Sequence, residues 1–153
     1  MKNKGIYILF LLVSLSFFSC GKDKIMRNRF LGTWNVDLYQ RDLIKQSGTE
    51  VLYKKENAGY ITFTNPFPDQ KYNKELEFTG SIETQGGTSE LAGSGQIDDE
   101  ASRWIVYNAL CEGIGCDIAY TITKSTARKL EVFTISYAGT PGEHFKLTLH
   151  MSK

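Results

Sequence analysis

Apolar residues recur at every second position in most runs of the chain after Phe30, and this pattern limits what the chain can form. In the clearest run, the residues that alternate with polar neighbours are Phe145, Leu147, Leu149 and Met151. A two-residue period places such side chains on one face of a β-strand, whereas an amphipathic helix needs a period of about 3.6 residues. The pattern therefore predicts an all-β domain and argues against an α/β enzyme fold.

Turn-forming residues separate these runs, for example at 57–59, 86–87 and 139–142. Such spacing favours strands that follow one another in an antiparallel up-and-down meander. Eight or nine strands, each with one apolar face, bury that face by closing into a barrel or by packing as a sandwich, and we expect the barrel. A short helical turn is expected at 24–30, and the predicted strands are 33–40, 50–55, 60–64, 75–84, 88–97, 102–110, 116–124, 129–138 and 143–152.

The amino-terminal segment has the features of a secretory signal that ends at a cysteine. Lys2 and Lys4 precede an apolar run over residues 6–18, which is followed shortly by Cys20. A membrane-spanning helix needs roughly 20 apolar residues, so this run is too short to span. Its charged start is typical of a cleavable signal peptide. The sequence around Cys20 resembles a lipobox, which implies that residues 1–19 are removed and that Cys20 carries a lipid.

The lipobox implies a membrane-attached protein of the cell envelope, and we expect the outer membrane. Each buried methylene of an acyl chain contributes about 0.8 kcal/mol, so two or three chains anchor firmly whereas one chain holds only marginally. On this interpretation residues 20–29 form a lipidated tether and residues 30–153 form the barrel domain. The alternative is an ordinary secreted protein in which Cys20 is incidental.

The balance of charges argues against one class of partner. The chain has 18 basic and 17 acidic residues, and removal of residues 1–19 takes away two lysines, which leaves 16 basic against 17 acidic residues. A nucleic-acid-binding surface needs a clustered basic face, and no such cluster is present in the sequence. We therefore expect no nucleic acid partner.

Two further cysteines, Cys111 and Cys116, lie in the stretch Cys-Glu-Gly-Ile-Gly-Cys. Outside the cytoplasm an even pair of cysteines usually forms a disulfide, and the two glycines allow the chain to turn between the thiols. The alternatives are two free thiols or a metal site. Structural zinc sites use four ligands, and no histidine lies near this stretch. The sequence therefore favours the disulfide and predicts no metal.

No arrangement of residues in this sequence is typical of catalysis. A nucleophile elbow, a phosphate-binding glycine loop and a zinc-binding helix are all absent, so we expect neither an enzyme nor a cofactor. The acidic triplet 98–100 is a weak calcium candidate that is better explained as a solvated turn. His144 and His150 lie too far apart along one strand to share a metal. Residues 93–95 (Gly-Ser-Gly) more often mark a bulge or a bend than a phosphate site.

Residues 30–36 contain a Gly-x-Trp motif, formed by Gly32 and Trp34, between the helical turn and the first predicted strand. This arrangement resembles the start of a lipocalin, and with the lipobox the whole chain resembles the lipocalin-like lipoproteins of Gram-negative bacteria. The resemblance implies that Trp34 closes one end of the barrel and that Gly32 lets the chain pass beneath it. Lipocalins also carry a late arginine that stacks on this tryptophan. Residues 143–152 contain none, and Arg128 comes one strand too early.

The predicted interior of the barrel suggests a function. The inward-facing residues are expected to be Trp34, Val36, Leu38, Ile61, Phe63, Leu76, Phe78, Ile82, Ile118, Tyr120, Ile122, Phe145, Leu147 and Leu149. Ligand pockets are mostly apolar with a few polar groups, so we expect a non-enzymatic binding domain for a small apolar or amphipathic molecule. The candidate ligand contacts are Phe78, Tyr107, Tyr120 and Tyr137. The alternative is a barrel or sandwich filled by its own side chains, whose loops bind a protein or a glycan.

Overall fold

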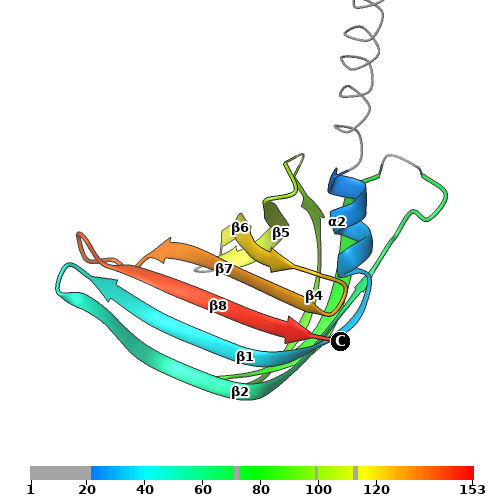
Figure 1. The fold of residues 1–153 in the computed structure, drawn as a ribbon. Helices are drawn as coiled ribbons and strands as arrows, with labels where there is room; N and C mark the ends of the chain where they lie inside the picture. Colours follow the sequence, from blue (N-terminus) through cyan, green and yellow to red (C-terminus); the bar gives the residue numbers. More distant parts are fainter. Residues whose placement is uncertain (1–21, 71–72, 99, 112–113) are drawn as a thin grey trace, which may run out of the picture.

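The computed structural model describes residues 22–70, 73–98, 100–111 and 114–153, and the side chains of residues 22–24 and 108–117 lie outside this description. Eight antiparallel strands pair in sequence order, and the last pairs with the first, so the sheet closes into a barrel (Figure 1). The elements are α2 (Lys22–Phe30), β1 (Gly32–Lys45), β2 (Gly48–Thr64), β3 (Glu75–Thr84), β4 (Gly87–Ile97), β5 (Arg103–Cys111), β6 (Ile114–Ser125), β7 (Lys129–Tyr137) and β8 (His144–Ser152).

This architecture confirms the predicted fold class, an all-β antiparallel up-and-down barrel with a short helix before the first strand. The strands and the hydrophobic core that the structure describes all lie within residues 22–153. No helix in the described part of the chain is long and apolar enough to cross a membrane.

β2 is one continuous strand where the sequence predicted two strands, over 50–55 and 60–64. The residues between them, 57–59, were expected to form a turn but form an irregularity within the strand. Asn57 adopts the left-handed backbone conformation here, with a φ of 51°. Asparagine tolerates that conformation better than most residues, and turns and β-bulges both use it. The prediction of two separate strands was therefore wrong.

A bulge in β1 itself changes which of its residues face the interior. Val36 pairs with Met151 and Leu38 pairs with His150, the next residue of β8, so Asp37 is an extra residue of β1 opposite β8. The alternation of side chains shifts by one position at such a bulge. Tyr39 consequently lines the interior, and the adjacent Leu38 takes the outer face, contrary to the prediction that Leu38 points inward.

Aromatic side chains fill the end of the barrel that lies nearest to α2. Phe30 and Trp34 are fully buried. The centroid of the Phe63 ring lies 5.2 Å from that of the Phe30 ring and 5.1 Å from that of the Trp104 ring. The Nε1 atom of Trp34 donates a hydrogen bond of 2.5 Å to the carbonyl oxygen of Phe30. Arg29 of α2 donates a hydrogen bond of 2.9 Å to a backbone carbonyl at the end of β6. These contacts hold the helix against this closed end.

Two glycines of β4 allow other groups to approach the strand closely. A Cβ atom at Gly93 would lie 2.6 Å from Cζ of Phe78, and a Cβ atom at Gly95 would lie 2.2 Å from the carbonyl oxygen of Ile105 and 3.0 Å from Nε1 of Trp104. Both glycines pair in regular register with β3, so the bulge or bend predicted at 93–95 does not form between these two described strands. Glycine in a strand permits such a close approach of a neighbouring group, and here it serves packing.

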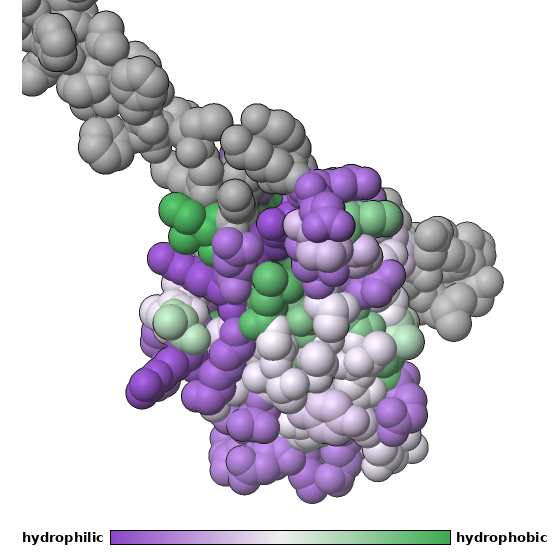
Figure 2. Space-filling view, turned by 90° about the vertical axis from the view of Figure 1, so that its right-hand side faces the viewer, coloured by the Kyte–Doolittle hydropathy of each residue, from purple (hydrophilic) through white to green (hydrophobic). Residues whose placement is uncertain are grey.

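The outer surface at the closed end is mainly polar. Figure 2, which views this end, shows hydrophobic side chains only as small patches among hydrophilic ones. Ile25 of α2 and Phe67 of the loop after β2 are exposed at 57% and 42%, and scattered exposed apolar residues of this kind are common on protein surfaces. Among the described residues in this view, no broad apolar surface is visible.

The strands pair over unequal lengths around the barrel. β3 and β4 pair at ten positions, over Glu75–Thr84, whereas β4 and β5 pair at three positions, over residues 95–97. β2 pairs with β3 only from Gly59 onward. The β1–β2 and β7–β8 hairpins extend beyond β3 and β4 at the end away from α2 (Figure 1). The barrel is therefore packed at the α2 end and open at the opposite end.

Candidate ligand-binding site

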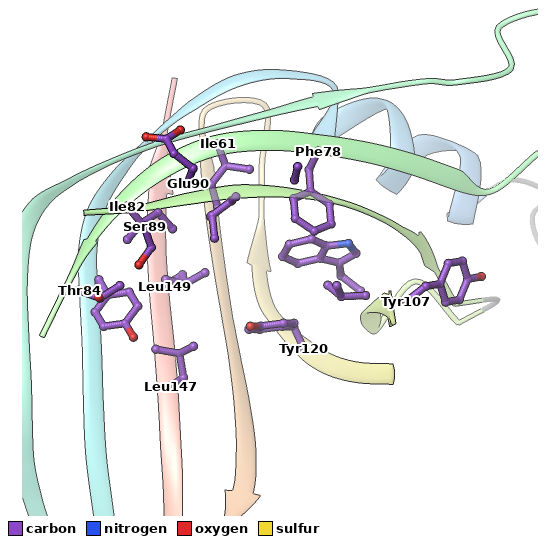
Figure 3. A pocket seen from close by; sticks show the side chains of 15 residues that line it. Ile61, Phe78, Ile82, Thr84, Ser89, Glu90, Tyr107, Tyr120, Leu147 and Leu149 are labelled. Carbon is purple, nitrogen blue, oxygen red and sulfur yellow. The ribbon is translucent and has the colours of Figure 1, made fainter. Parts of the chain in front are cut away.

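A cavity of about 430 Å³ lies inside the barrel between the aromatic core and the open end (Figure 3). Side chains from every strand except β7 line it. The lining is predominantly aliphatic and aromatic, with a few polar groups, and consists of Tyr39, Ile61, Phe78, Ile82, Thr84, Ser89, Glu90, Leu91, Ala92, Trp104, Val106, Tyr107, Tyr120, Leu147 and Leu149. This mixture is the usual lining of a small-molecule pocket.

Three aromatic rings form the side of the cavity that borders the core. The Phe78 and Trp104 rings meet edge to face with centroids 5.3 Å apart. The Trp104 and Tyr120 rings stack with centroids 5.1 Å apart and an interplanar angle of 27°. Aromatic pairs of this geometry add about 0.5–1.5 kcal/mol beyond the area that they bury. The rings therefore give the cavity a rigid apolar base.

Two tyrosines place hydroxyl groups in the inner wall. Burial raises the pKa of Tyr120 to about 12, and the nearby Tyr39 adds to this rise. Burial also raises the pKa of Tyr39, although the charge of Arg41 opposes the change. Both phenols are consequently neutral at physiological pH and can donate as well as accept a hydrogen bond.

Arg41 lies one inward position beyond Tyr39, toward the open end of β1. Its Cζ atom lies 4.3 Å from the centroid of the Phe145 ring. The Tyr39 and Tyr53 rings meet edge to face nearby, with centroids 5.9 Å apart. Arg41 and Tyr53 are not among the residues that line the cavity, but they lie next to the lining residue Tyr39, on its open side.

The structure brings three of the four predicted ligand contacts to this cavity. Phe78, Tyr107 and Tyr120 line it, and Tyr107 stands at the edge of the group in Figure 3. Tyr137 lies elsewhere, at the end of β7, where it is 60% exposed and packs edge-on against His144 with centroids 6.3 Å apart. Whether any of these residues binds a ligand stays a prediction.

Sequence analysis missed Tyr39 and Arg41 as interior residues. The predicted first strand ended at residue 40, and a simple alternation from Trp34 puts odd-numbered positions on the outer face. A bulge at Asp37, where β1 pairs with β8, reverses this alternation after Val36. The Asn-Ala-Gly stretch at 57–59 lies on β2 opposite this point, and its residue types favour the conformations that bulges need.

Asp98 organises the turn between β4 and β5. Its carboxylate accepts four hydrogen bonds, from the backbone N–H groups of Ser102 and Arg103, the Ser102 hydroxyl and Nε of Arg103. Burial raises the pKa of Asp98, but the hydrogen bonds from Arg103 and Ser102 outweigh it and hold the pKa below its usual value. Within the described residues, no group of three or more His, Cys, Asp or Glu side chains is placed to hold a metal ion.

The predictions for the three cysteines fall outside what the structure describes. Cys20 precedes the described residues, and the side chains of Cys111 and Cys116 are among those left out. The backbone register pairs Cys111 with Ile114 and Ala109 with Cys116, so the two cysteines stand two residues out of register across the hairpin. The lipid on Cys20 and the disulfide both stay predictions.

Comparisons with known proteins give matches only at the level of structure. No protein-family model and no curated protein sequence matches this chain. Apocrustacyanin C1 is similar in structure, with 10% sequence identity and a TM-score of 0.52, over 83% of this chain and 62% of that chain. Insecticyanin of the tobacco hornworm Manduca sexta has 12% identity and a TM-score of 0.51, over 82% of this chain and 62% of its own.

A third similar structure is that of lipocalin 12 from rat epididymis. It has 14% identity and a TM-score of 0.51, over 82% of this chain and 66% of its own. This chain therefore spans about two thirds or less of the length of each of these three proteins. At such low identity the likeness concerns the fold, and the chain accordingly has a lipocalin-like β-barrel fold.

Proposed function

We propose that this chain is a lipid-anchored protein of the cell envelope whose barrel binds a small apolar or amphipathic molecule without catalysing a reaction. The cavity of about 430 Å³ carries the proposal. Ligand pockets commonly measure about 300–1,000 Å³, and an apolar cavity of roughly 150 Å³ already admits benzene. The space inside this barrel is thus large enough for a guest several times the volume of benzene.

The shape of the interior favours this proposal over a barrel filled by its own side chains. The aromatic core occupies the α2 end of the barrel, and the lining side chains surround open space between that core and the open end (Figure 3). The closed ring of eight strands also rules out the sandwich arrangement. The outer surface of the closed end adds support, because hydrophobic side chains appear in Figure 2 only as small patches among hydrophilic ones.

The proposed anchor is compatible with an accessible cavity. α2 begins at Lys22, two residues after Cys20, and packs over the closed end of the barrel. A lipid on Cys20 would hold that end near the membrane, and the open end faces the opposite way (Figure 1). A ligand could therefore reach the cavity while the protein remains attached.

Binding can be tested with residues 22–153, which contain all the described strands, once circular dichroism has established that this segment folds. Native mass spectrometry would detect a co-purified guest, and titration with the neutral dye phenylnaphthylamine would measure saturable binding. Leu147→Trp adds bulk inside the cavity, and Ile135→Trp adds the same side chain on the outer surface, where Ile135 is 52% exposed. We expect the first variant to weaken dye binding at least about tenfold, or ~1.4 kcal/mol, and the second to leave it unchanged.

Two results would contradict the proposed binding function. One is the absence of both a bound guest and saturable dye fluorescence in a folded protein. The other is equal dye binding by the parent and by a folded Leu147→Trp variant. The anchor needs a separate test in cells, where Cys20→Ser in the full chain should abolish palmitate incorporation and release the protein from membranes. Unchanged labelling and fractionation of that variant would show that Cys20 is not the lipid site.

A further inference from the structure

Arg41 is a cation on the inner face of the barrel. It lies two positions after Tyr39, which lines the cavity, and it pairs directly with Leu147 of β8, which also lines the cavity. Residues that stand opposite each other in antiparallel strands project to the same face of the sheet. On its other side Arg41 pairs with Tyr53 of β2. The register of both neighbouring strands therefore directs Arg41 toward the interior.

The charge of Arg41 has no counter-ion within the described part of the chain. The ion pairs found there involve other basic residues, and Arg41 has no hydrogen-bond acceptor there either. Its contact is the Phe145 ring, 4.3 Å from Cζ to centroid. An aromatic face stabilises a guanidinium without engaging the N–H groups at its edge. Arg41 is thus held in place with its donors available.

The neighbours of Arg41 strengthen its attraction for an anion. Tyr39 lies beside it as a neutral phenol that can donate a hydrogen bond, since burial raises the pKa of Tyr39. Arg41 is also half-buried, and charges attract more strongly where protein replaces water. A guanidinium fork binds a carboxylate through two parallel hydrogen bonds. The group therefore has the donors and the geometry for an anionic head group.

The acidic residues near Arg41 and the cavity form no ion pair with Arg41 in the described structure. Asp42, the next residue in the chain, is buried and accepts a hydrogen bond of 2.8 Å from Nε2 of Gln40. Glu83 is paired with Lys55 at 2.7 Å, so these two charges neutralise each other. Glu90 accepts a hydrogen bond of 2.8 Å from Ser81, and Figure 3 shows its carboxylate directed away from the centre of the cavity. The inner wall at the open end therefore keeps the positive charge of Arg41.

We infer that the barrel prefers amphiphiles with an anionic head group, in particular carboxylates, and that Arg41 binds the head group. This inference rests on the proposed binding function. The apolar tail of such a ligand would extend from Arg41 past Leu147 and Leu149 toward the aromatic base at Phe78 and Trp104. Along this line the interior changes from the cation at Arg41, beside the cavity, to the apolar lining of the cavity, and this order matches the polarity of a fatty acid.

The test compares two ligands that share one tail. Dodecanoic acid and dodecanol are each used to displace phenylnaphthylamine from residues 22–153. We expect the acid to bind the parent about tenfold more tightly than the alcohol, as a charge-assisted hydrogen-bonded pair of ~1.4 kcal/mol would give. Arg41→Gln should bring the two affinities to within about twofold and leave the alcohol unchanged, and Arg41→Lys should keep a smaller preference because the fork geometry is lost.

Arg128→Gln is the matched control, because it removes the same charge from an exposed residue at the closed end of the barrel. It should preserve the preference for the acid, and circular dichroism would establish that every variant folds. Equal displacement by acid and alcohol in the parent, or a preference that survives Arg41→Gln, would overturn the inference while leaving the proposed binding function intact. A parent that binds neither the dye nor the amphiphiles would overturn both.

Discussion

The Nζ atom of Lys153 lies 4.3 Å above the centroid of the Trp34 indole ring. The same atom donates hydrogen bonds of 3.1 Å and 2.5 Å to the carbonyl oxygens of Arg29 and Leu31. Burial at this position lowers the pKa of Lys153. The resemblance to lipocalins implied an arginine over the tryptophan, and a lysine directly after β8 occupies that place instead. This contact joins the chain after the last strand to the junction between α2 and β1.

Loss of the Lys153 contact should destabilise the barrel. Lys153→Gln removes the cation over the indole and weakens two hydrogen bonds, so we expect the free energy of unfolding to fall by about 1 kcal/mol. Urea denaturation followed by tryptophan fluorescence measures the change. Lys129→Gln, at an exposed lysine at the start of β7, is the control and should have no measurable effect. Equal stability of both variants would show that the contact over Trp34 contributes nothing.

Gly93 should not tolerate a side chain as long as Phe78 is present. A Cβ atom at Gly93 would lie 2.6 Å from the Phe78 ring, and overpacking of a core usually costs about 1–3 kcal/mol. Gly93→Ala should therefore lower the melting temperature, whereas Gly86→Ala should not, since its nearest neighbour would be 3.9 Å away. Combining Gly93→Ala with Phe78→Leu should recover part of the loss. Strictly additive effects of the two substitutions would contradict the close packing.

Asp98 should stabilise the fold at neutral pH and lose that effect in acid. The pKa of Asp98 is below its usual value in the folded protein, so its contribution is complete above about pH 4 and is lost as the pH falls through the folded-state pKa. Asp98→Asn should lower the free energy of unfolding by about 1–3 kcal/mol at pH 7. Denaturation of parent and variant at several pH values should show this difference shrinking below pH 4. The control is Asp69→Asn, which removes an exposed loop carboxylate and should cause no comparable change in the free energy of unfolding. If the difference between the parent and Asp98→Asn were the same at every pH, the charge of Asp98 would have no role.

The predicted disulfide can be examined directly by mass spectrometry. Protein produced in an oxidising compartment and alkylated without reduction should carry no label on Cys111 or Cys116. Prior reduction should expose both thiols to labelling. Because the register offsets the cysteines by two residues, the bond would tie the hairpin diagonally, and its short loop would contribute about 2 kcal/mol in the chain-entropy model. Labelling of both residues before reduction would leave them as free thiols.

The fold followed from the sequence because alternation and turn residues are local properties. The run from Phe145 to Met151 matches β8 closely, since no irregularity interrupts it. Residues 57–59 misled the prediction because a turn and a bulge use the same residue types and the same backbone conformations. Only the pairing with β1 distinguishes the two, and that pairing is a long-range property.

The candidate site was less predictable than the fold. Phe78 and Tyr120 were expected inside because their strands alternate regularly, and they do line the cavity. Tyr39 and Arg41 were missed because a bulge at Asp37 in their own strand, which shows only in the pairing with β8, reverses their direction. The volume of the cavity depends on how far opposite walls stand apart, which residue types along one strand do not encode. The packing role of Gly93 and Gly95 likewise depends on the groups that approach them in the folded barrel, which the local sequence does not show.

The short pairing between β4 and β5 makes one side of the barrel wall compliant. Three residue pairs close the sheet there, compared with ten between β3 and β4. Separating the wall along this line, away from Trp104, breaks few backbone hydrogen bonds, and it leaves the contact between the Phe30 and Phe63 rings in place. Regions with few such bonds open locally at low free energy. The cavity can therefore widen for a larger ligand and narrow for a smaller one, while α2 and the closed end of the barrel keep their positions.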